Sequence, residues 1–231
     1  MFEKISNLKK EKINVKILLH GDSGSGKTYS ASGSPKPLIL LTEKNGLISI
    51  ESSNPDAVVA VCTTAQQVRD VFQEIIKNGI KAHGCDTLVI DSLTEIQRLF
   101  KDDILEKSKK RLFSLQNWGE LTEVMRKFMR MIRNLDMDVV CTCLCQYNPE
   151  EEVTRITPQF EGKSTPQEVS QYFNAVGFVF RSATKSAKGE TTHSHKIMFE
   201  GPARVTCKPC GSLKGVVDAD INEIFKQIRG E

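Results

Sequence analysis

The hydrophobic pattern of the chain alternates between short apolar runs and longer stretches in which apolar residues recur every three or four positions. The short runs predict buried strands, and they lie at residues 14–20, 38–41, 57–62, 87–90 and 139–145. The longer stretches predict amphipathic helices, and they lie at residues 68–76, 93–104, 121–135 and 221–228. Strands that alternate with helices predict an α/β fold with a mainly parallel central sheet between two helical layers.

The pattern changes in the last third of the chain. Residues 147–166 are polar and have no periodic apolar pattern, which predicts a long functional or mobile loop. Apolar runs at 175–180 and 192–200 predict a hairpin with a basic tip. We expect Asp218 or Asp220 to cap the final helix.

The first apolar run leads into a glycine-rich turn that fits Gly-x-x-x-x-Gly-Lys-[Ser/Thr] at every fixed position, and a helix start follows. Without side chains at the glycines, consecutive backbone N–H groups can surround a polyphosphate. Lys27 would supply a charge to the outer phosphates, and the Thr28 hydroxyl would bind Mg²⁺. The predicted nucleotide-binding residues are Gly21, Asp22, Ser23, Gly24, Ser25, Gly26, Lys27 and Thr28.

Polar residues end three of the predicted strands, at the edge where open α/β sheets bind their ligands. Glu43 follows the second strand closely. Asp91 and Ser92 end the fourth in the form of a Walker B motif, so Asp91 is expected to hold Mg²⁺ directly or through water. Gln146 ends the fifth and either senses the γ-phosphate or satisfies backbone groups in a turn.

Composition narrows the class of protein. The chain has 231 residues, 39% of them hydrophobic and 26% charged, which fits a soluble domain over residues 13–231 after a polar lead-in at 1–12. A net charge of +3 does not by itself argue for nucleic acid, so any DNA site must be local. The N-terminus lacks an apolar signal core and no run approaches membrane-spanning length, which predicts a cytoplasmic protein without a membrane partner.

Basic residues gather in two places where they could contact nucleic acid or form a solvated surface. One cluster precedes Phe113 and Trp118, and the other lies within the polar segment 147–166. The candidate DNA-binding residues are Lys107, Lys109, Lys110, Arg111, Arg155 and Lys163.

The chain also contains histidine and cysteine residues of the kinds that bind zinc in proteins. Two histidines and two cysteines form a nominal zinc set, but whether they share a face cannot be settled from spacing. The set is His193, His195, Cys207 and Cys210. The seven cysteines, an odd number without an export signal, are interpreted as reduced thiols.

The order of these motifs resembles the ATPase core of RecA-type recombinases. The shared features are the P-loop, the strand ending at Glu43, the Asp91-Ser92 pair and the strand ending at Gln146, over roughly residues 14–165. The chain is most similar to the small, core-only AAA/RecA-type ATPases of phages, which include single-strand annealing recombinases. The resemblance implies a three-layer P-loop NTPase fold that uses ATP and Mg²⁺.

The resemblance also implies roles for individual residues. Glu43 would orient or deprotonate the attacking water, and Gln146 would couple the γ-phosphate to a second DNA-binding loop at 147–165. The first DNA loop is expected between Lys107 and Trp118.

Family members assemble as rings or filaments, in which a basic residue of a neighbour completes the site. Lys208 lies about where that residue belongs, but many relatives carry Lys-x-Arg and this chain has Lys208-Pro209-Cys210. Arg204 and Lys214 are therefore further candidates. The implied partners are single-stranded DNA, other copies of this chain and a single-strand-binding protein, in a bacterial host cytoplasm if the protein is phage-encoded.

Three functions fit the sequence to different degrees. The favoured one is a Mg-ATP-dependent, single-stranded-DNA-binding ATPase of phage-type recombination, annealing or repair. The alternative is a nucleotide-dependent switch or helicase-loader-like adaptor that acts on a protein partner. A small-molecule kinase ranks below both, because neither an arginine-bearing lid nor an acidic acceptor site is apparent.

Overall fold

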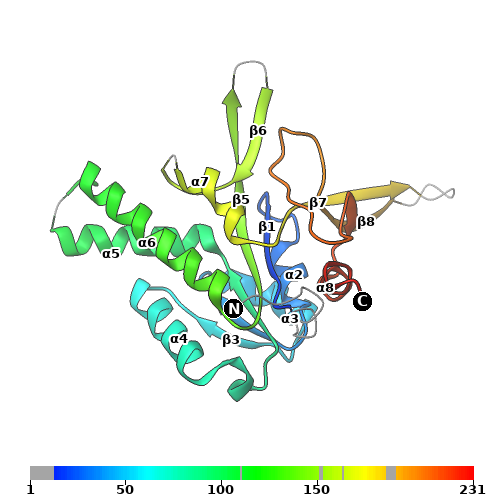
Figure 1. Ribbon diagram of the computed structural model, residues 1–231, viewed down its shortest axis with the longest axis horizontal. Coiled ribbons are helices and arrows are strands. Elements are labelled where there is room, and N and C mark those ends of the chain that lie inside the picture. Colours follow the sequence, from blue (N-terminus) through cyan, green and yellow to red (C-terminus); the bar gives the residue numbers. More distant parts are fainter. Residues whose placement is uncertain (1–12, 110, 151–152, 163, 186–190) are drawn as a thin grey trace, which may run out of the picture.

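The computed structural model describes residues 13–109, 111–150, 153–162, 164–185 and 191–231. The predicted lead-in at 1–12 lies outside these ranges, as do Lys110 and Lys163. Figure 1 shows the arrangement of the elements around one central sheet.

The strands form a nine-stranded, mainly parallel sheet in the order β3-β2-β4-β5-β1-β7-β8-β9, with β6 paired to β5. The β1, β2, β3, β4, β5 and β7 neighbours are parallel, whereas the β5–β6, β7–β8 and β8–β9 pairs are antiparallel. The strands are β1 (Lys16–Gly21), β2 (Pro37–Leu41), β3 (Val58–Val61), β4 (Thr87–Asp91), β5 (Asp138–Glu150), β6 (Val153–Pro158), β7 (Ala175–Lys185), β8 (Thr191–Met198) and β9 (Val216–Asp218). The predicted α/β class with a C-terminal hairpin and helix is confirmed.

Two helical layers cover the sheet. The helices are α2 (Lys27–Ser32), α3 (Leu47–Ser53), α4 (Ala65–Asn78), α5 (Leu93–Ser108), α6 (Leu115–Asn134), α7 (Ser164–Glu168) and α8 (Ile221–Arg229). Short 3₁₀ turns are η1 (Lys44–Gly46), η2 (Ile80–His83) and η3 (Val169–Tyr172).

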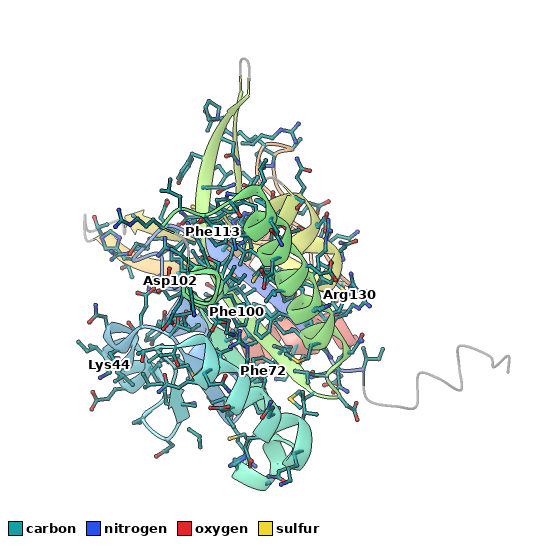
Figure 2. All side chains as sticks on the ribbon, turned by 90° about the vertical axis from the view of Figure 1, so that its left-hand side faces the viewer. Lys44, Phe72, Phe100, Asp102, Phe113 and Arg130 are labelled. Carbon is teal, nitrogen blue, oxygen red and sulfur yellow. The ribbon has the colours of Figure 1, made fainter. Side chains whose placement is uncertain are left out.

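One core lies under α4, α5 and α6. The rings of Phe72 and Phe100 both meet Phe128 edge to face, at centroid distances of 4.8 and 5.5 Å, and Figure 2 labels the first two in this layer. Met125 and Met129 are fully buried here, so the prediction that the methionine-rich stripe packs into the core is confirmed. A second core lies under α2, α3 and α8 on the other face of the sheet.

Polar caps fix where the helices begin. The side chains of Thr64, Ser92 and Ser114 accept hydrogen bonds from backbone N–H groups of α4, α5 and α6. Asp220, one of the two predicted candidates, caps α8. Ser92 separates Asp91, the last residue of β4, from Leu93, the first residue of α5, so the cap holds the Asp91 backbone between a strand and a helix.

The prediction of a long loop at 147–166 is wrong. β5 continues to Glu150, β6 returns as its antiparallel partner, and α7 begins at Ser164. The alternation of Thr154, Ile156 and their neighbours suits a strand, but with little buried apolar surface the pattern is weak. Figure 1 shows this hairpin projecting beyond the rest of the sheet.

Within the described residues, none of the helices is both long and apolar enough to cross a membrane.

Candidate active site

The P-loop forms a tight turn between β1 and α2. Gly24 and Gly26 have φ values of +75° and +98°, which side chains other than hydrogen disfavour. A Cβ on Gly21 would overlap the carbonyl oxygen of Val179, and one on Gly26 would overlap the ring of His195. The loop therefore needs glycine both for its backbone conformation and for its contact with β7 and β8.

Lys27 lies within the turn that precedes it. Its Nζ donates to the carbonyl oxygens of Gly21 and Asp22, at 3.0 and 2.7 Å. The residue is only 8% exposed, and burial lowers the pKa of its ammonium group. Its charge is thus held at the centre of the loop, where the sequence motif predicts the outer phosphates.

Thr28 and Asp91 come together across the sheet edge as the predicted metal site requires. The Thr28 Oγ1 donates to Asp91 Oδ2 at 2.8 Å, and Thr142 Oγ1 donates to the other carboxylate oxygen. Hydroxyl and carboxylate oxygens are the hard ligands that Mg²⁺ prefers, so the residues present fit this ion. Thr142 was not predicted from the sequence. The feature that could have indicated it is its place as a polar residue between two buried cysteines of a core strand.

A second threonine joins the ends of β2 and β4. Thr42 Oγ1 donates to the Asp91 carbonyl oxygen at 3.0 Å and accepts from the Ser92 N–H at 3.0 Å. Glu43 directly follows Thr42, so these bonds hold the segment that carries Glu43 against the strand that carries Asp91. Thr42 was also missed from sequence, since a threonine at a strand end has many ordinary roles.

One cleft of about 530 Å³ lies beside the P-loop. Lys27, Thr28, Glu43 and Asp91 all face it, together with Ser23, Gly24 and Gly26 of the P-loop. The structure therefore brings the predicted phosphate-binding, metal-binding and water-activating residues to one space. Their catalytic roles remain predictions.

The sequence predicted that Gln146 lies at the end of a strand, and this prediction is wrong. Gln146 sits within the β5–β6 ladder, opposite Thr157, because β5 runs on for four more residues. Among the described residues of β5, the cleft is lined by Leu144 and not by Gln146. Among the hydrogen bonds of the described residues, none joins the Gln146 side chain to the P-loop, so its role as a γ-phosphate sensor stays a prediction.

The residues on either side of Gln146 make that contact instead. Tyr147 Oη donates to Asp22 Oδ2 at 2.8 Å, and Cys145 Sγ donates to Asp22 Oδ1 at 3.2 Å. Burial and the Asp22 carboxylate raise the pKa of the Cys145 thiol to about 11, so the thiol keeps its proton at neutral pH. Asp22 thereby joins the P-loop to the β5–β6 hairpin.

Two further cleft residues come from β7 and β8, where sequence reasoning assigned no nucleotide contact. Arg181 and His195 line the cleft and are directly paired across the two strands. His195 Nδ1 lies 2.9 Å from the Ser25 carbonyl oxygen, and its ring centroid is 5.9 Å from that of Tyr29. Nothing in the local sequence indicates that a distant hairpin packs on the P-loop.

The candidate DNA-binding residues within the described ranges lie on two separate elements. Lys107, Lys109 and Arg111 lie at the end of α5 and just after it, whereas Arg155 lies on β6. Figure 1 shows the α5–α6 connection and the β5–β6 hairpin in different parts of the molecule. Lys107 Nζ donates to Asp103 at 2.8 Å, but its side chain is still 66% exposed.

The aromatic residues beside the first basic cluster pack against each other. The rings of Phe113 and Trp118 meet edge to face at 4.8 Å, and the Lys101 ammonium lies 5.6 and 5.3 Å from their centroids. Both rings contact the core under α5 and α6. They support the α5–α6 connection from within rather than offering open stacking faces.

Lys208, the first candidate for a cation acting on a neighbouring subunit, is engaged within its own chain. Its Nζ donates to the carbonyl oxygens of Phe173 and Ser170, at 2.6 and 3.3 Å. Its backbone pairs with Val176, near the start of β7. By contrast, Arg204 is exposed.

The nominal zinc ligands are directed to other partners. His195 contacts Ser25, and Cys207 Sγ donates to the Met198 carbonyl oxygen at 3.2 Å. Across the part of the chain that the structure describes, no group of three or more His, Cys, Asp or Glu side chains is placed to hold a metal ion. All seven cysteines lie in that part and are free thiols.

Comparison with known proteins identifies one family. A family model described as an AAA domain matches residues 13–208. A solved structure, described as a prototypical ATPase from the type III secretion system of pathogenic bacteria, shares 16% identity and a TM-score of 0.44. The alignment covers 76% of this chain and 53% of that one, so this chain spans about half the length of the secretion ATPase. No curated protein matches the chain.

Proposed function

The chain belongs to the AAA-domain family, and from its site we propose that it is a P-loop ATPase that hydrolyses Mg-ATP and binds single-stranded DNA in phage-type recombination, annealing or repair. Nucleotide binding and an ATPase fold follow from the family. We propose in addition that the chain binds single-stranded DNA, that this DNA stimulates ATP turnover, and that the protein acts in recombination, annealing or repair.

The geometry supports hydrolysis by in-line attack of water on the γ-phosphate. Two carboxylates line the cleft, and Asp91 accepts hydrogen bonds from Thr28 and Thr142. We therefore assign to the other carboxylate, Glu43, the role of orienting the attacking water or taking its proton. Lys27 and the backbone N–H groups of the P-loop would stabilise the charge that develops on the phosphate oxygens. Thr28 and Asp91 would hold Mg²⁺, which would neutralise further negative charge.

One observation supports a link between this site and DNA. The P-loop residue Asp22 accepts hydrogen bonds from Tyr147 and Cys145 at the base of the β5–β6 hairpin. That hairpin carries Arg155 and projects past the sheet, and it continues from Leu144 of β5, which lines the cleft. A change in the P-loop on ATP binding or hydrolysis would therefore reach the hairpin through Asp22.

The proposal also includes assembly with other copies of the chain. Of the described basic residues, Lys107, Lys109 and Arg111 are exposed at the end of α5 and just after it, and Arg155 is exposed on β6. One subunit therefore offers the DNA two short contacts rather than one continuous groove. Rings or filaments of several subunits would add such contacts along one strand. Nucleotide-dependent assembly would then set the affinity for DNA.

Binding of a fluorescent oligo-deoxythymidine, measured by anisotropy at two salt concentrations with and without Mg-ATP, tests the proposal. We expect binding that Mg-ATP strengthens and that salt weakens, because phosphate contacts release counterions. Arg111→Gln should weaken binding several-fold and reduce the slope of log affinity against log salt by about one. Arg98→Gln is the matched control, since Arg98 pairs with Glu95 on α5 at 3.0 Å.

The alternative function predicts a different result. A nucleotide switch or helicase-loader-like adaptor would bind a protein partner, and its basic segments would only solvate the surface. Intact ATP turnover without salt-sensitive DNA binding would favour that alternative and would overturn the DNA proposal.

A further inference from the structure

A second pocket, of about 340 Å³, lies between α6 and the segment formed by α7 and η3. Side chains from both walls line it, and they are Arg126, Arg130, Arg133, Glu168, Gln171 and Tyr172. None of these residues lines the cleft beside the P-loop. The chemistry of ATP hydrolysis therefore does not account for this pocket.

Three arginines reach the pocket from one face of α6. Arg126, Arg130 and Arg133 are four and three positions apart, and residues at these spacings lie on the same side of a helix. Their sequence neighbours Met129 and Ile132 are buried in the core, so the arginines lie on the outer side of α6. Figure 2 labels Arg130 on this side.

The opposite wall already places one carboxylate against the arginines. Glu168 accepts two hydrogen bonds from Arg126, at 2.9 Å from Nε and 2.5 Å from Nη2. This paired geometry is one in which a guanidinium binds a carboxylate strongly. The hydrogen bonds from Arg126 lower the pKa of the Glu168 carboxyl, and the charge of Arg130 acts in the same direction. The pocket thus favours ionised carboxylates and holds one from its own chain.

The other two guanidiniums are open to a ligand. Arg130 and Arg133 are exposed, and among the described residues neither has a carboxylate within ion-pair distance. The Arg133 guanidinium lies 5.9 Å from the centroid of the Tyr172 ring, which supports it at the pocket wall. Side chains three positions apart on a helix are about 5–6 Å apart at Cβ. The two guanidiniums can therefore bind one acidic group or two neighbouring ones.

The walls of this pocket suit carboxylates better than a nucleic-acid strand. The Glu168 carboxylate would repel a chain of phosphates that passed it. Tyr172 is only 7% exposed and lies against Arg133, so it offers no face on which a base could stack. Arg130 lies about 22 Å along α6 from its first residue, Leu115, at a rise of about 1.5 Å per residue. The pocket is thus separate from the basic residues at the α5–α6 connection.

We propose that Arg130 and Arg133 form a docking site for an acidic peptide segment of a partner protein, which places aspartate or glutamate carboxylates on these two guanidiniums. Gln171 is exposed at the same pocket, and its amide can donate a further hydrogen bond. The inference does not rest on ATP hydrolysis or on DNA binding. Because the pocket and the P-loop cleft share no residue, the chain can hold a nucleotide and this partner together.

Anisotropy of a fluorescein-labelled hexaglutamate peptide, titrated with the full chain at low salt, tests the docking site. We expect saturable binding that salt weakens, and no binding of hexaglutamine. Arg130→Gln and Arg133→Gln should each weaken hexaglutamate binding about fivefold, the upper end of the range for exposed ion pairs. Arg130→Lys should weaken it about twofold, because the ammonium keeps the charge but loses the planar fork of donors.

Two variants control for general attraction to a basic surface. Lys127→Gln removes one charge from an exposed position of α6 that is not among the described lining residues of the pocket, and it should leave hexaglutamate binding unchanged. Arg111→Gln, after α5, should also leave hexaglutamate binding unchanged. Binding of oligo-deoxythymidine should be the same in Arg130→Gln as in the wild type.

Four results would overturn the docking site. The wild type does not bind hexaglutamate saturably, or Arg130→Gln and Arg133→Gln bind it as the wild type does. Lys127→Gln weakens binding as much as Arg130→Gln, so that the peptide responds only to net charge. Arg130→Gln weakens binding of oligo-deoxythymidine but not of hexaglutamate, which would assign the pocket to nucleic acid. Each of these results leaves ATP hydrolysis at the P-loop as proposed, since that activity is measured separately.

Discussion

Single residues in this protein show how burial sets protonation. His20 lies at the end of β1 with no exposed surface, and its Nε2 donates to the Thr206 carbonyl oxygen at 2.7 Å. Burial lowers the pKa of its imidazole from 6.5 to about 4, and the nearby charge of Lys27 acts in the same direction. The ring is therefore neutral and structural in the folded protein at physiological pH.

This shift predicts a loss of stability in mild acid. Between pH 6.5 and 4 the unfolded chain binds a proton at His20 and the folded chain does not, so the free energy of unfolding falls as the pH falls through this window. The shift corresponds to about 3 kcal/mol. Urea unfolding of the wild type at pH 7 and at pH 4 should show this loss, and His20→Gln should lack it.

A matched histidine provides the control for that prediction. His83 is exposed beside Glu74, so His83→Gln removes a histidine without removing a buried imidazole, and the loss of stability assigned to His20 should persist in this variant. If the free energy of unfolding falls equally with pH in the wild type and in His20→Gln, His20 is not the group that causes the loss of stability in acid.

At the same scale, sequence could predict residues that belong to a motif. Strand ends and fixed spacing predict the P-loop, Glu43 and Asp91, and most of the P-loop residues line one cleft together with these two carboxylates. Thr42 and Thr142 could not be identified, because their importance comes from hydrogen bonds to Asp91 across neighbouring strands. Only the folded register brings those partners together.

Among the elements, the β5–β6 hairpin joins the P-loop to one of the two proposed DNA contacts, the one that includes Arg155. Tyr147 is 51% exposed, and its hydroxyl donates to Asp22 at the turn of the P-loop. Tyr147 belongs to neither hydrophobic core, so loss of this hydrogen bond should affect the coupling between the P-loop and the hairpin rather than folding.

Tyr147→Phe tests this coupling. Loss of one hydrogen bond to a carboxylate at a half-exposed site corresponds to about 1 kcal/mol, or about fivefold. We expect stimulation of ATP turnover by single-stranded DNA to fall by about that factor, with turnover in the absence of DNA nearly unchanged. Tyr172→Phe, at a buried ring that contacts Arg133, is the control. Unchanged stimulation in Tyr147→Phe would exclude this route.

The hairpin also shows where prediction of elements fails. The central strands and the long helices have strong apolar periodicity and were predicted from it. β6 has few buried residues, and its pairing with β5 is a contact between strands that a local pattern does not reveal. A polar strand and a polar loop have similar sequences, so 147–166 was assigned to the wrong class.

For the whole molecule, the sheet order explains why the cleft has two chemically different sides. Strands β4 and β5 bring carboxylate and hydroxyl groups to one side of the P-loop, and β7 and β8 bring an arginine and a histidine to the other. The alternation of strands and helices predicted the class of fold. It could not predict that the C-terminal hairpin joins the same sheet next to β1, because that placement depends on packing over long separations in sequence.

The most direct test of the account is ATP hydrolysis by the wild type and by Glu43→Gln, with and without single-stranded DNA, at low and high salt. We expect DNA to stimulate the wild type less at high salt, and Glu43→Gln to lose at least about a hundredfold in turnover while still binding ATP. Glu51→Gln, an exposed glutamate on α3, should behave as the wild type. Wild-type turnover in Glu43→Gln, or turnover that DNA does not change at either salt concentration, would contradict the account.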